Sequence, residues 1–469
     1  MRRVVGVAAG LFLLGGSVAM MAMDSVPKEE YRSRRLALAE RLNGGAAMVF
    51  AAKAPTNEIT LFRQDSDFFY LTGWTEPGAA LVVIGAGPAT TVPRSGEQVP
   101  AHGYREILFV PSRNLVLEKY TGEKMDAATA GAAAKAGIDA VMPFTALPQV
   151  VGAFAAEDRR RAAALWTQTD TPGATATMSF VGASLGLDTT AVQAKDVRAL
   201  TMTLRTVKSP AEIALLRKAS DASMAGQRAG MRAIRPGVQE QAIAGVEVGT
   251  FMEQGCERWS YPPIVGSGVN STVLHYSTNE HAMEGGGVVV IDAACERSMY
   301  ASDITRTMPV DGRFTARQKE IYDIVLGAQR AAEAAFVAGK YRMGNLKDRG
   351  TEVTDSLDKV AYEYINSHGK DLHGDPLGKY FLHGLGHSVG IDVHDPMDYA
   401  HTRLDKGMVF TIEPGVYIAE EKIGVRIEDV VYVDASGRLV DLIESLPHET
   451  GAVEAAMKGG QGAGKGLRP

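Results

Sequence analysis

Cysteine is scarce in this chain of 469 residues, which contains only Cys256 and Cys295. Two cysteines cannot form a disulfide framework, and without a Cys-x-x-Cys motif a typical structural zinc site is excluded. No disulfide pair is evident from the sequence. We therefore expect both cysteines to be small, buried apolar residues.

Long runs of positive charge and of apolar residues are also missing. The formal net charge is −6, and no long lysine or arginine run occurs, which argues against nucleic acid as a main partner. Beyond the N-terminus, no segment has the roughly 18 uninterrupted apolar residues that a membrane span requires. We expect no membrane association beyond a possible signal segment.

The N-terminus has the pattern of that signal segment. Two arginines precede an apolar stretch at 4–14, and the small residues Ser-Val-Ala follow at 17–19. This order is typical of a secretory signal peptide, so we expect residues 1–19 to be removed and the protein to be exported, periplasmic or secreted. If a methionine at 20, 21 or 23 is the true start, the protein is cytoplasmic.

The length favours two domains, and the helical and strand segments along the chain predict an α+β fold class. Short apolar strands alternate with helical stretches and predict an N-terminal α/β domain over 24–195, with an exposed loop at 85–104. A capping box at Ser209 and Glu212, with Pro210 at the first helical position, opens a second domain over 205–455. The glycine-rich residues 456–469 are expected to form a disordered tail.

Histidines are concentrated in one short stretch. Residues 381–395 contain three of the ten histidines, His383, His387 and His394, separated by glycine and serine. A single histidine here would be read as a loop residue bonded to the backbone. Three of them, together with the carboxylates described next, predict a functional site.

Four carboxylates lie in strongly apolar runs. Asp292 ends an apolar strand at 288–292, and a second strand at 300–307 carries Asp303, so a hairpin would bring the two together. Glu413 ends another strand at 408–413. Glu428 lies in a strand at 424–433, where it is expected to share a face with Arg426.

Such a set of buried carboxylates predicts a metal centre. A carboxylate buried in a strand is unfavourable unless it is paired or binds a cation. Four of them carry more negative charge than one divalent ion balances, which favours two ions. The oxygen-rich set suits Mn²⁺, Mg²⁺ or Fe²⁺, with Zn²⁺ and Co²⁺ as alternatives.

The order of these residues resembles that of a known family. Asp292, Asp303, His387, Glu413 and Glu428 resemble the five ligands of the dimetal centre in pita-bread metallopeptidases. Asp-Ile-Thr-Arg-Thr at 303–307, His-Gly-Leu-Gly-His at 383–387 and Glu-Pro-Gly-Val-Tyr at 413–417 resemble the aminopeptidase P and prolidase branch. The run at 62–73 is similar to the aminopeptidase P N-terminal domain. The resemblance covers 30–450 and implies a C-terminal pita-bread catalytic domain.

The resemblance also implies roles for single residues. Asp292 would bind one metal, Asp303 and Glu428 would bridge both, and His387 and Glu413 would complete the second site around a bridging hydroxide nucleophile. Glu413 would also carry the proton to the leaving amine. The residues expected to contact substrate are His275, His383, His394 and Tyr417. Arg426 would hold Asp292 in place.

The implied reaction is hydrolysis of the bond between an N-terminal residue and proline in a peptide, with Mn²⁺ as the expected ion. The loop at 419–424 is shorter than in many aminopeptidase P enzymes, so an Xaa-Pro dipeptidase is the alternative. A non-catalytic binding protein of the same fold is less compatible with five occupied ligand positions. Family resemblance further implies a dimer or tetramer.

Overall fold

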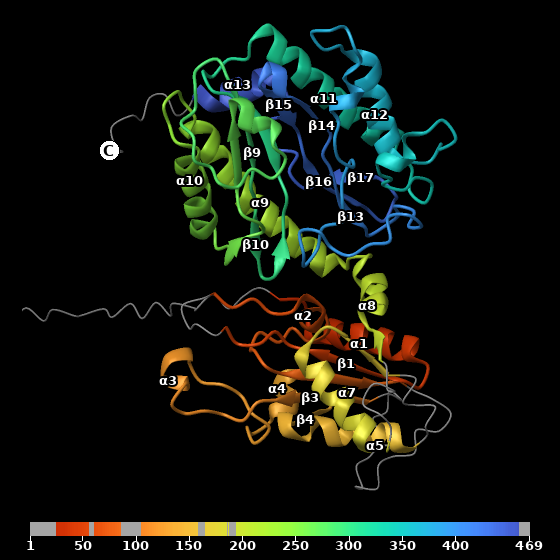
Figure 1. Ribbon diagram of the computed structural model, residues 1–469. Coiled ribbons are helices and arrows are strands. Elements are labelled where there is room, and N and C mark those ends of the chain that lie inside the picture. Colours follow the sequence, from red (N-terminus) through yellow and green to blue (C-terminus); the bar gives the residue numbers. More distant parts are fainter. Residues whose placement is uncertain are drawn as a thin grey trace, which may run out of the picture.

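The computed structural model describes residues 25–55, 61–85, 105–157, 165–184, 186 and 194–458. They form two domains, one above the other in Figure 1, joined through α8 (Arg198–Arg205). The expected signal segment, nearly all of the loop predicted at 85–104 and the tail beyond 458 lie outside these residues. Among the described residues, no helix has the length and apolar character needed to cross a bilayer.

The N-terminal domain is built on a six-stranded mixed sheet. Its strand order is β4-β3-β2-β1-β5-β6. The strands are β1 (Ala46–Phe50), β2 (Ala80–Ile84), β3 (Arg105–Val110), β4 (Ala140–Pro143), β5 (Leu165–Thr167) and β6 (Lys195–Asp196). The helices are α1 (Lys28–Leu42), α2 (Ser66–Thr72), α3 (Glu118–Thr121), α4 (Ala132–Ala136), α5 (Leu147–Glu157) and α7 (Pro172–Ser184).

Strand β1 explains why this sheet is covered on both faces. Every residue of β1 is buried, and successive side chains point to opposite faces of a strand. Val49 lies in the apolar cluster that includes α1, whereas Met48 and Phe50 lie in the cluster that includes α5 and α7. The predicted α/β architecture of this region is therefore observed.

The C-terminal domain contains two long helices and four small antiparallel sheets. The strand orders are β12-β9-β8, β13-β16-β17, β14-β15 and β11-β10-β7. The strands are β7 (Arg258–Trp259), β8 (Ile264–Ser267), β9 (Val288–Asp292), β10 (Cys295–Arg297), β11 (Tyr300–Ala301), β12 (Thr305–Pro309), β13 (Val409–Ile412), β14 (Gly415–Ile418), β15 (Ile423–Arg426), β16 (Asp429–Val433) and β17 (Leu439–Asp441). The helices are α9 (Pro210–Ala233), α10 (Glu240–Glu253), α11 (Ala316–Ala335), α12 (Leu357–His368) and α13 (Thr450–Lys458).

The predicted helix start at Ser209 is confirmed. The Ser209 side chain accepts from the Glu212 N–H, and the Glu212 side chain accepts from the Ser209 N–H, which makes a complete capping box with Pro210 at the first position. Helix α11 begins with a second capping box, between Thr315 and Gln318. One face of α11 is buried among apolar side chains such as Ile321 and Val325.

Two predicted strands are interrupted at predicted metal ligands, Asp303 and Glu428. The strand predicted at 300–307 divides into β11 and β12, with Asp303 between them. The strand predicted at 424–433 divides into β15 and β16, with Glu428 between them. Each break lets the local chain leave the regular alternation, so the expected shared face of Arg426 and Glu428 does not come from one continuous strand.

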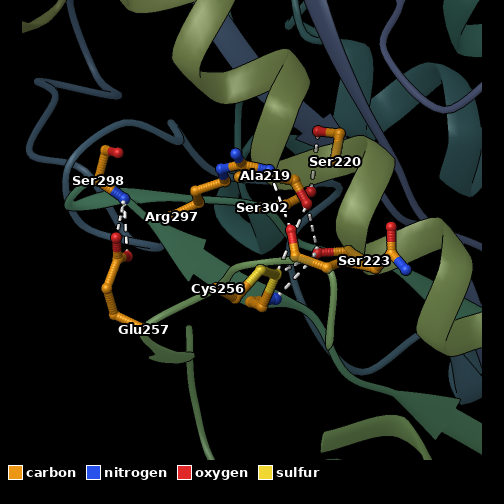
Figure 2. The surroundings of a disulfide bond; sticks show 10 residues. Ala219, Ser220, Ser223, Cys256, Glu257, Arg297, Ser298 and Ser302 are labelled. Carbon is orange, nitrogen blue, oxygen red and sulfur yellow. Dashed lines mark hydrogen bonds between the residues drawn. A yellow bond between two sulfur atoms is a disulfide. The ribbon is translucent and has the colours of Figure 1, made fainter. Parts of the chain in front are cut away.

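The structure also corrects the prediction for the cysteines. Cys256 and Cys295 form a disulfide, with their Cα atoms 6.1 Å apart and a sequence separation of 39 (Figure 2). Cys256 follows α10, and Cys295 begins β10, which lies beside β7. Both are buried as predicted, but the proximity of these two segments arises only from the tertiary fold.

The disulfide ties the segment that follows Asp292 to helices α9 and α10. The Cys295 N–H donates to Ser223 Oγ at 2.9 Å, and Ser220 Oγ lies 3.0 Å from Ser302 Oγ. Figure 2 shows Ser220 and Ser223 on α9, near the disulfide. The chain between Asp292 and Asp303 is thus held by a covalent bond and by buried hydroxyl groups.

Candidate metal centre

The five predicted ligands converge on one cavity. Its volume is about 510 Å³, and its lining includes Asp292, Asp303, His387, Glu413 and Glu428. Asp292 is the last residue of β9 and lies opposite Thr305 of β12. Glu428 is placed beside them because its N–H donates to the Thr305 carbonyl at 3.1 Å. Residues far apart in sequence therefore meet at one wall of the domain.

The separations within this set are those of a shared metal-binding site. His387 Nε2 lies 3.3 Å from Asp303 Oδ2 and 3.4 Å from Glu413 Oε1. Asp292, Asp303 and Glu428 each offer one carboxylate oxygen, and these oxygens lie within 4.8 Å of one another. A ring nitrogen of His387 and one oxygen each of Glu413 and Glu428 form a second group of the same size. Asp303 and Glu428 are both buried, with 5% and 1% of their surface exposed.

The electrostatics of the cluster are unfavourable without a cation. Burial, followed by the charges of Asp303 and Glu413, raises the pKa of Glu428 well above its usual range. Burial also raises the pKa of Glu413 to about 7, and the Asp303 charge adds to that rise. Burial lowers the pKa of His387, but its hydrogen bond to Asp303 and the charge of Glu413 outweigh this and raise the pKa to about 9.

One buried oxygen supports the same interpretation. Asp292 Oδ1 is inaccessible and has no hydrogen-bond partner, whereas Oδ2 accepts from Arg426 Nη2 at 2.6 Å. An unsatisfied buried carboxylate oxygen is unfavourable unless a cation binds it. The cluster as a whole contains four carboxylates and one imidazole. This set of mostly oxygen ligands fits two divalent ions.

Behind the carboxylates, Arg426 begins a hydrogen-bonded series that leads to His383. Arg426 Nη1 donates to the Tyr417 hydroxyl at 2.9 Å, and that hydroxyl lies 2.8 Å from His383 Nε2. His383 Nδ1 lies 2.8 Å from the Gly384 carbonyl, so it carries the hydrogen and Nε2 accepts from Tyr417. Burial, with the charge of Arg426, lowers the pKa of His383 to about 3, which keeps this imidazole neutral.

The other predicted substrate residues occupy different parts of the cavity. His275 and His394 line it and are exposed. The ring of His394 lies 4.0 Å from that of His387, and burial, followed by the charge of His387, lowers the pKa of His394. Tyr417 is buried behind His383 and Arg426, so it supports the site from beneath its surface.

Hydroxyl groups complete the support of the carboxylates. Tyr261 donates to Asp303 Oδ1 at 2.5 Å, and Thr305 Oγ1 donates to Glu428 Oε2 at 2.6 Å. The sequence analysis assigned neither contact. The position of Thr305, two residues after Asp303, could have indicated that its side chain points toward the site. The contact of Tyr261 depends on the tertiary fold and has no such local indication.

Arg63 of the N-terminal domain and Arg205 at the end of the joining helix α8 hold the loop that carries His394, and the sequence did not predict either contact. Arg205 Nη2 lies 2.7 Å from Asp392 Oδ2 and 2.6 Å from Asp395 Oδ1. Arg63 Nη2 donates to the Ile391 carbonyl at 2.8 Å, and Arg63 Nε lies 2.8 Å from Glu296 Oε2. The site is therefore supported by both domains.

Comparison with known proteins agrees with this geometry. Residues 214–435 match the model of metallopeptidase family M24, and residues 31–162 match that of the aminopeptidase P N-terminal domain. The Xaa-Pro aminopeptidase of Escherichia coli is 33% identical over 462 residues, which cover 93% of this chain and 99% of that protein. Human Xaa-Pro aminopeptidase 3 is 32% identical over 410 residues, 84% of this chain and 76% of that protein.

A solved structure extends the comparison to three dimensions. Zinc-substituted E. coli aminopeptidase P in complex with product superposes with a TM-score of 0.77 at 30% identity, over 93% of this chain and 99% of that one. The similarity includes both domains and the whole region of the candidate site. The chain therefore belongs to the aminopeptidase P family of M24 metallopeptidases.

Proposed function

We propose that this protein is a dimetal-dependent aminopeptidase that hydrolyses the bond between an N-terminal residue and a following proline. The observation that carries the proposal is the convergence of Asp292, Asp303, His387, Glu413 and Glu428 on one cavity that His275 and His394 also line. Family membership supplies the substrate class. We further propose 24–195 as the accessory domain and 205–455 as the catalytic domain.

The five converging residues would hold two divalent ions. When bound, these ions would lower the pKa of water to supply a nucleophile near neutral pH and would polarise the scissile carbonyl. Arg426, 2.6 Å from Asp292 Oδ2, keeps that carboxylate oriented at the wall of the cavity and leaves its Oδ1 without a hydrogen-bond partner. Thr305 fixes Glu428 in the same way.

Other side chains would handle the substrate and its protons. We assign to Glu413 the transfer of a proton to the leaving amine, since its carboxyl lies in the cavity beside His387. His394 and His275 are exposed at the cavity and are placed to donate to the peptide carbonyl and its oxyanion. His383 would join them once its contact with Tyr417 rearranges, since both of its nitrogens are engaged in the structure.

The proline specificity has a physical basis in the substrate. A bond to proline is a tertiary amide without N–H, so a site that recognises it cannot depend on that donor. Ile264, Leu274 and Val393 provide apolar lining in the cavity, suited to a pyrrolidine ring. The alternative, an Xaa-Pro dipeptidase, would share this chemistry and differ only in the length of peptide accepted.

Paired substrates test the proposal. We expect the metal-loaded protein to release alanine from Ala-Pro-Ala faster than from Ala-Pro, measured by chromatography of products. Glu413→Gln should reduce kcat by at least about a hundredfold, whereas Glu444→Gln, at an exposed position, should leave it unchanged. Cleavage of the dipeptide alone would establish the dipeptidase instead.

Manganese is the proposed ion. The ligand set is dominated by carboxylate oxygen, which suits Mn²⁺ as well as Zn²⁺, Co²⁺ or Fe²⁺. Apoprotein prepared with a chelator should regain most activity with Mn²⁺. If Zn²⁺ restores most activity and Mn²⁺ little, the choice of manganese is wrong although the dimetal site stands.

We also propose that the protein is exported. The signal pattern at 1–19 and the buried disulfide between Cys256 and Cys295 are independent features that both fit an oxidising compartment. Cell fractionation with N-terminal sequencing should find the mature protein outside the cytoplasm, beginning near residue 20. We expect a dimer or tetramer in solution, which light scattering on the purified protein measures.

A further inference from the structure

Each of the two long helices of the C-terminal domain carries one buried glutamine. Gln227 lies on α9 and Gln329 on α11, the two long helices that begin with capping boxes. Figure 1 labels both helices, with α9 beside β10 and α11 beside β14. The glutamines are 0% and 1% exposed. A buried amide is retained at low free energy only where it makes hydrogen bonds.

Gln227 joins the two chain segments that directly follow the proposed metal-binding aspartates, Asp292 and Asp303. Its Nε2 donates to the Ala293 carbonyl and to the Ile304 carbonyl, each at 3.1 Å. Ala293 follows Asp292, and Ile304 follows Asp303. One amide group therefore fixes the chain directly after both carboxylates. The orientation of the amide follows from its contacts, because the opposite one would place an oxygen against two carbonyls.

Gln329 contacts the chain beside the two glutamates, Glu413 and Glu428. Its Nε2 donates to the Ile412 carbonyl at 3.0 Å and to Asp429 Oδ2 at 2.9 Å. Ile412 precedes Glu413, and Asp429 follows Glu428. The Ile427 carbonyl, on the other side of Glu428, lies at the limit of contact, 3.5 Å. This amide links the chain beside one glutamate to the chain beside the other.

These contacts act where regular strand pairing stops. Asp303 lies between β11 and β12, and Glu428 lies between β15 and β16, so neither carboxylate is held by an uninterrupted ladder. A metal site requires its ligands to be held within a fraction of an ångström. The glutamines restrain the chain beside these carboxylates, Gln227 through two backbone carbonyls and Gln329 through one carbonyl and the Asp429 side chain. Neither glutamine lines the cavity.

We propose that Gln227 and Gln329 are paired positioning residues, each setting the separation of two metal-binding carboxylates. The inference rests on the proposed dimetal function and names the residues that make the site accurate. Because each glutamine acts on a different pair of carboxylates, the effects of the two should be approximately additive in free energy.

Gln227→Met and Gln329→Met test this inference, because methionine keeps the length and removes the donors. Isothermal calorimetry on apoprotein should show Mn²⁺ binding about tenfold to a hundredfold weaker in each variant. The Co²⁺-loaded variants should show altered d–d absorption, a signature of changed coordination. Gln241→Met, at an exposed position on α10, serves as the matched control and should match the wild type.

A second substitution keeps the test decisive if Gln227→Met does not fold. In Gln227→Glu a buried, protonated carboxyl retains one of the two donors, so an intermediate loss of affinity is expected. Unchanged Mn²⁺ affinity and an unchanged Co²⁺ spectrum in folded variants would overturn the inference, even if stability falls. A wild-type protein that binds no metal would overturn the proposed function as well, which distinguishes the two failures.

Discussion

Arg205 and Asp395 form a buried ion pair between α8 and the histidine-rich loop, with Nη2 2.6 Å from Oδ1. Lys208 Nζ lies 3.1 Å from the other oxygen of Asp395, and Arg205 Nη1 lies 2.9 Å from Asp67 Oδ1. Burial raises the pKa of Asp395, but Lys208 and Arg205 outweigh it and hold the pKa below its ordinary value. This pair locks the residue next to His394.

Replacing Arg205 with methionine should therefore destabilise the protein. The substitution leaves Asp395 and Asp67 buried with less compensation, and breaking such a pair costs about 3–5 kcal/mol. Urea unfolding measures the change. Arg198→Met, which removes ion pairs with Asp170 and Asp196 at the surface, is the control and should cost no more than about 1 kcal/mol. Equal effects of the two substitutions would contradict the structural role of Arg205.

Tyr417→Phe should reduce activity while the metals remain bound. The change removes the hydroxyl between His383 and Arg426, leaving one buried acceptor and one buried donor unsatisfied. Loss of such an orienting contact typically lowers activity about tenfold to a hundredfold. Steady-state kinetics and metal analysis by mass spectrometry measure the two effects. Tyr120→Phe, whose side chain is 73% exposed, should behave as the wild type.

Removing the disulfide should lower stability without unfolding the site. The bridged cysteines are 39 residues apart, and a loop of that size corresponds to about 4 kcal/mol in the chain-entropy description. The double variant Cys256→Ala, Cys295→Ala and the wild type treated with a reductant should unfold at the same lower urea concentration. Finding two free thiols in denatured, unreduced wild-type protein would show that the bond does not form.

Glu333 should make stability fall as the pH rises toward neutrality. Burial, together with the charge of Asp429, raises the pKa of Glu333 from 4.5 to about 7. The folded state therefore holds this proton more tightly than the unfolded state, and the stabilisation present below pH 4.5 is lost between pH 4.5 and 7.

Glu333→Gln should consequently stabilise the protein by about 1 to 3 kcal/mol at pH 8 and have little effect at pH 4. Urea unfolding at the two pH values measures the difference. Glu320→Gln, on the same helix and 51% exposed, is the matched control and should show no comparable dependence. A stabilisation by Glu333→Gln that is independent of pH would contradict the explanation.

The sequence predicted the metal ligands of the C-terminal domain because each of them is recognisable from its neighbours in the sequence. Carboxylates inside runs of valine and isoleucine, such as Asp292 and Glu413, stand out against the expected composition of strands. Their order, with His387 between them, pointed to the family. The capping boxes and apolar strands likewise follow from short-range preferences.

The features that the sequence did not predict depend on long-range contacts. The disulfide joins segments that α10 and β10 bring together, and Arg205 reaches Asp395 across 190 residues. The strand breaks at Asp303 and Glu428 were missed because strand-favouring residues lie on both sides of each carboxylate and no local signal marks the interruption. Gln227 and Gln329 could not be distinguished from surface glutamines before their helices were placed.

The support that Arg63 and Arg205 give to the histidine-rich loop also bears on how this protein can be recombined with its relatives. Arg63 and Arg205 belong to the first half of the chain, whereas Glu296, Asp392 and Asp395 belong to the second. A hybrid joined between α8 and α9 would inherit acceptors from one parent and donors from the other. Domain exchange at this junction therefore requires that both parents have both arginines. If the junction is placed before α8, Arg205 stays with its acceptors, and the parent that donates the N-terminal domain must supply an equivalent of Arg63.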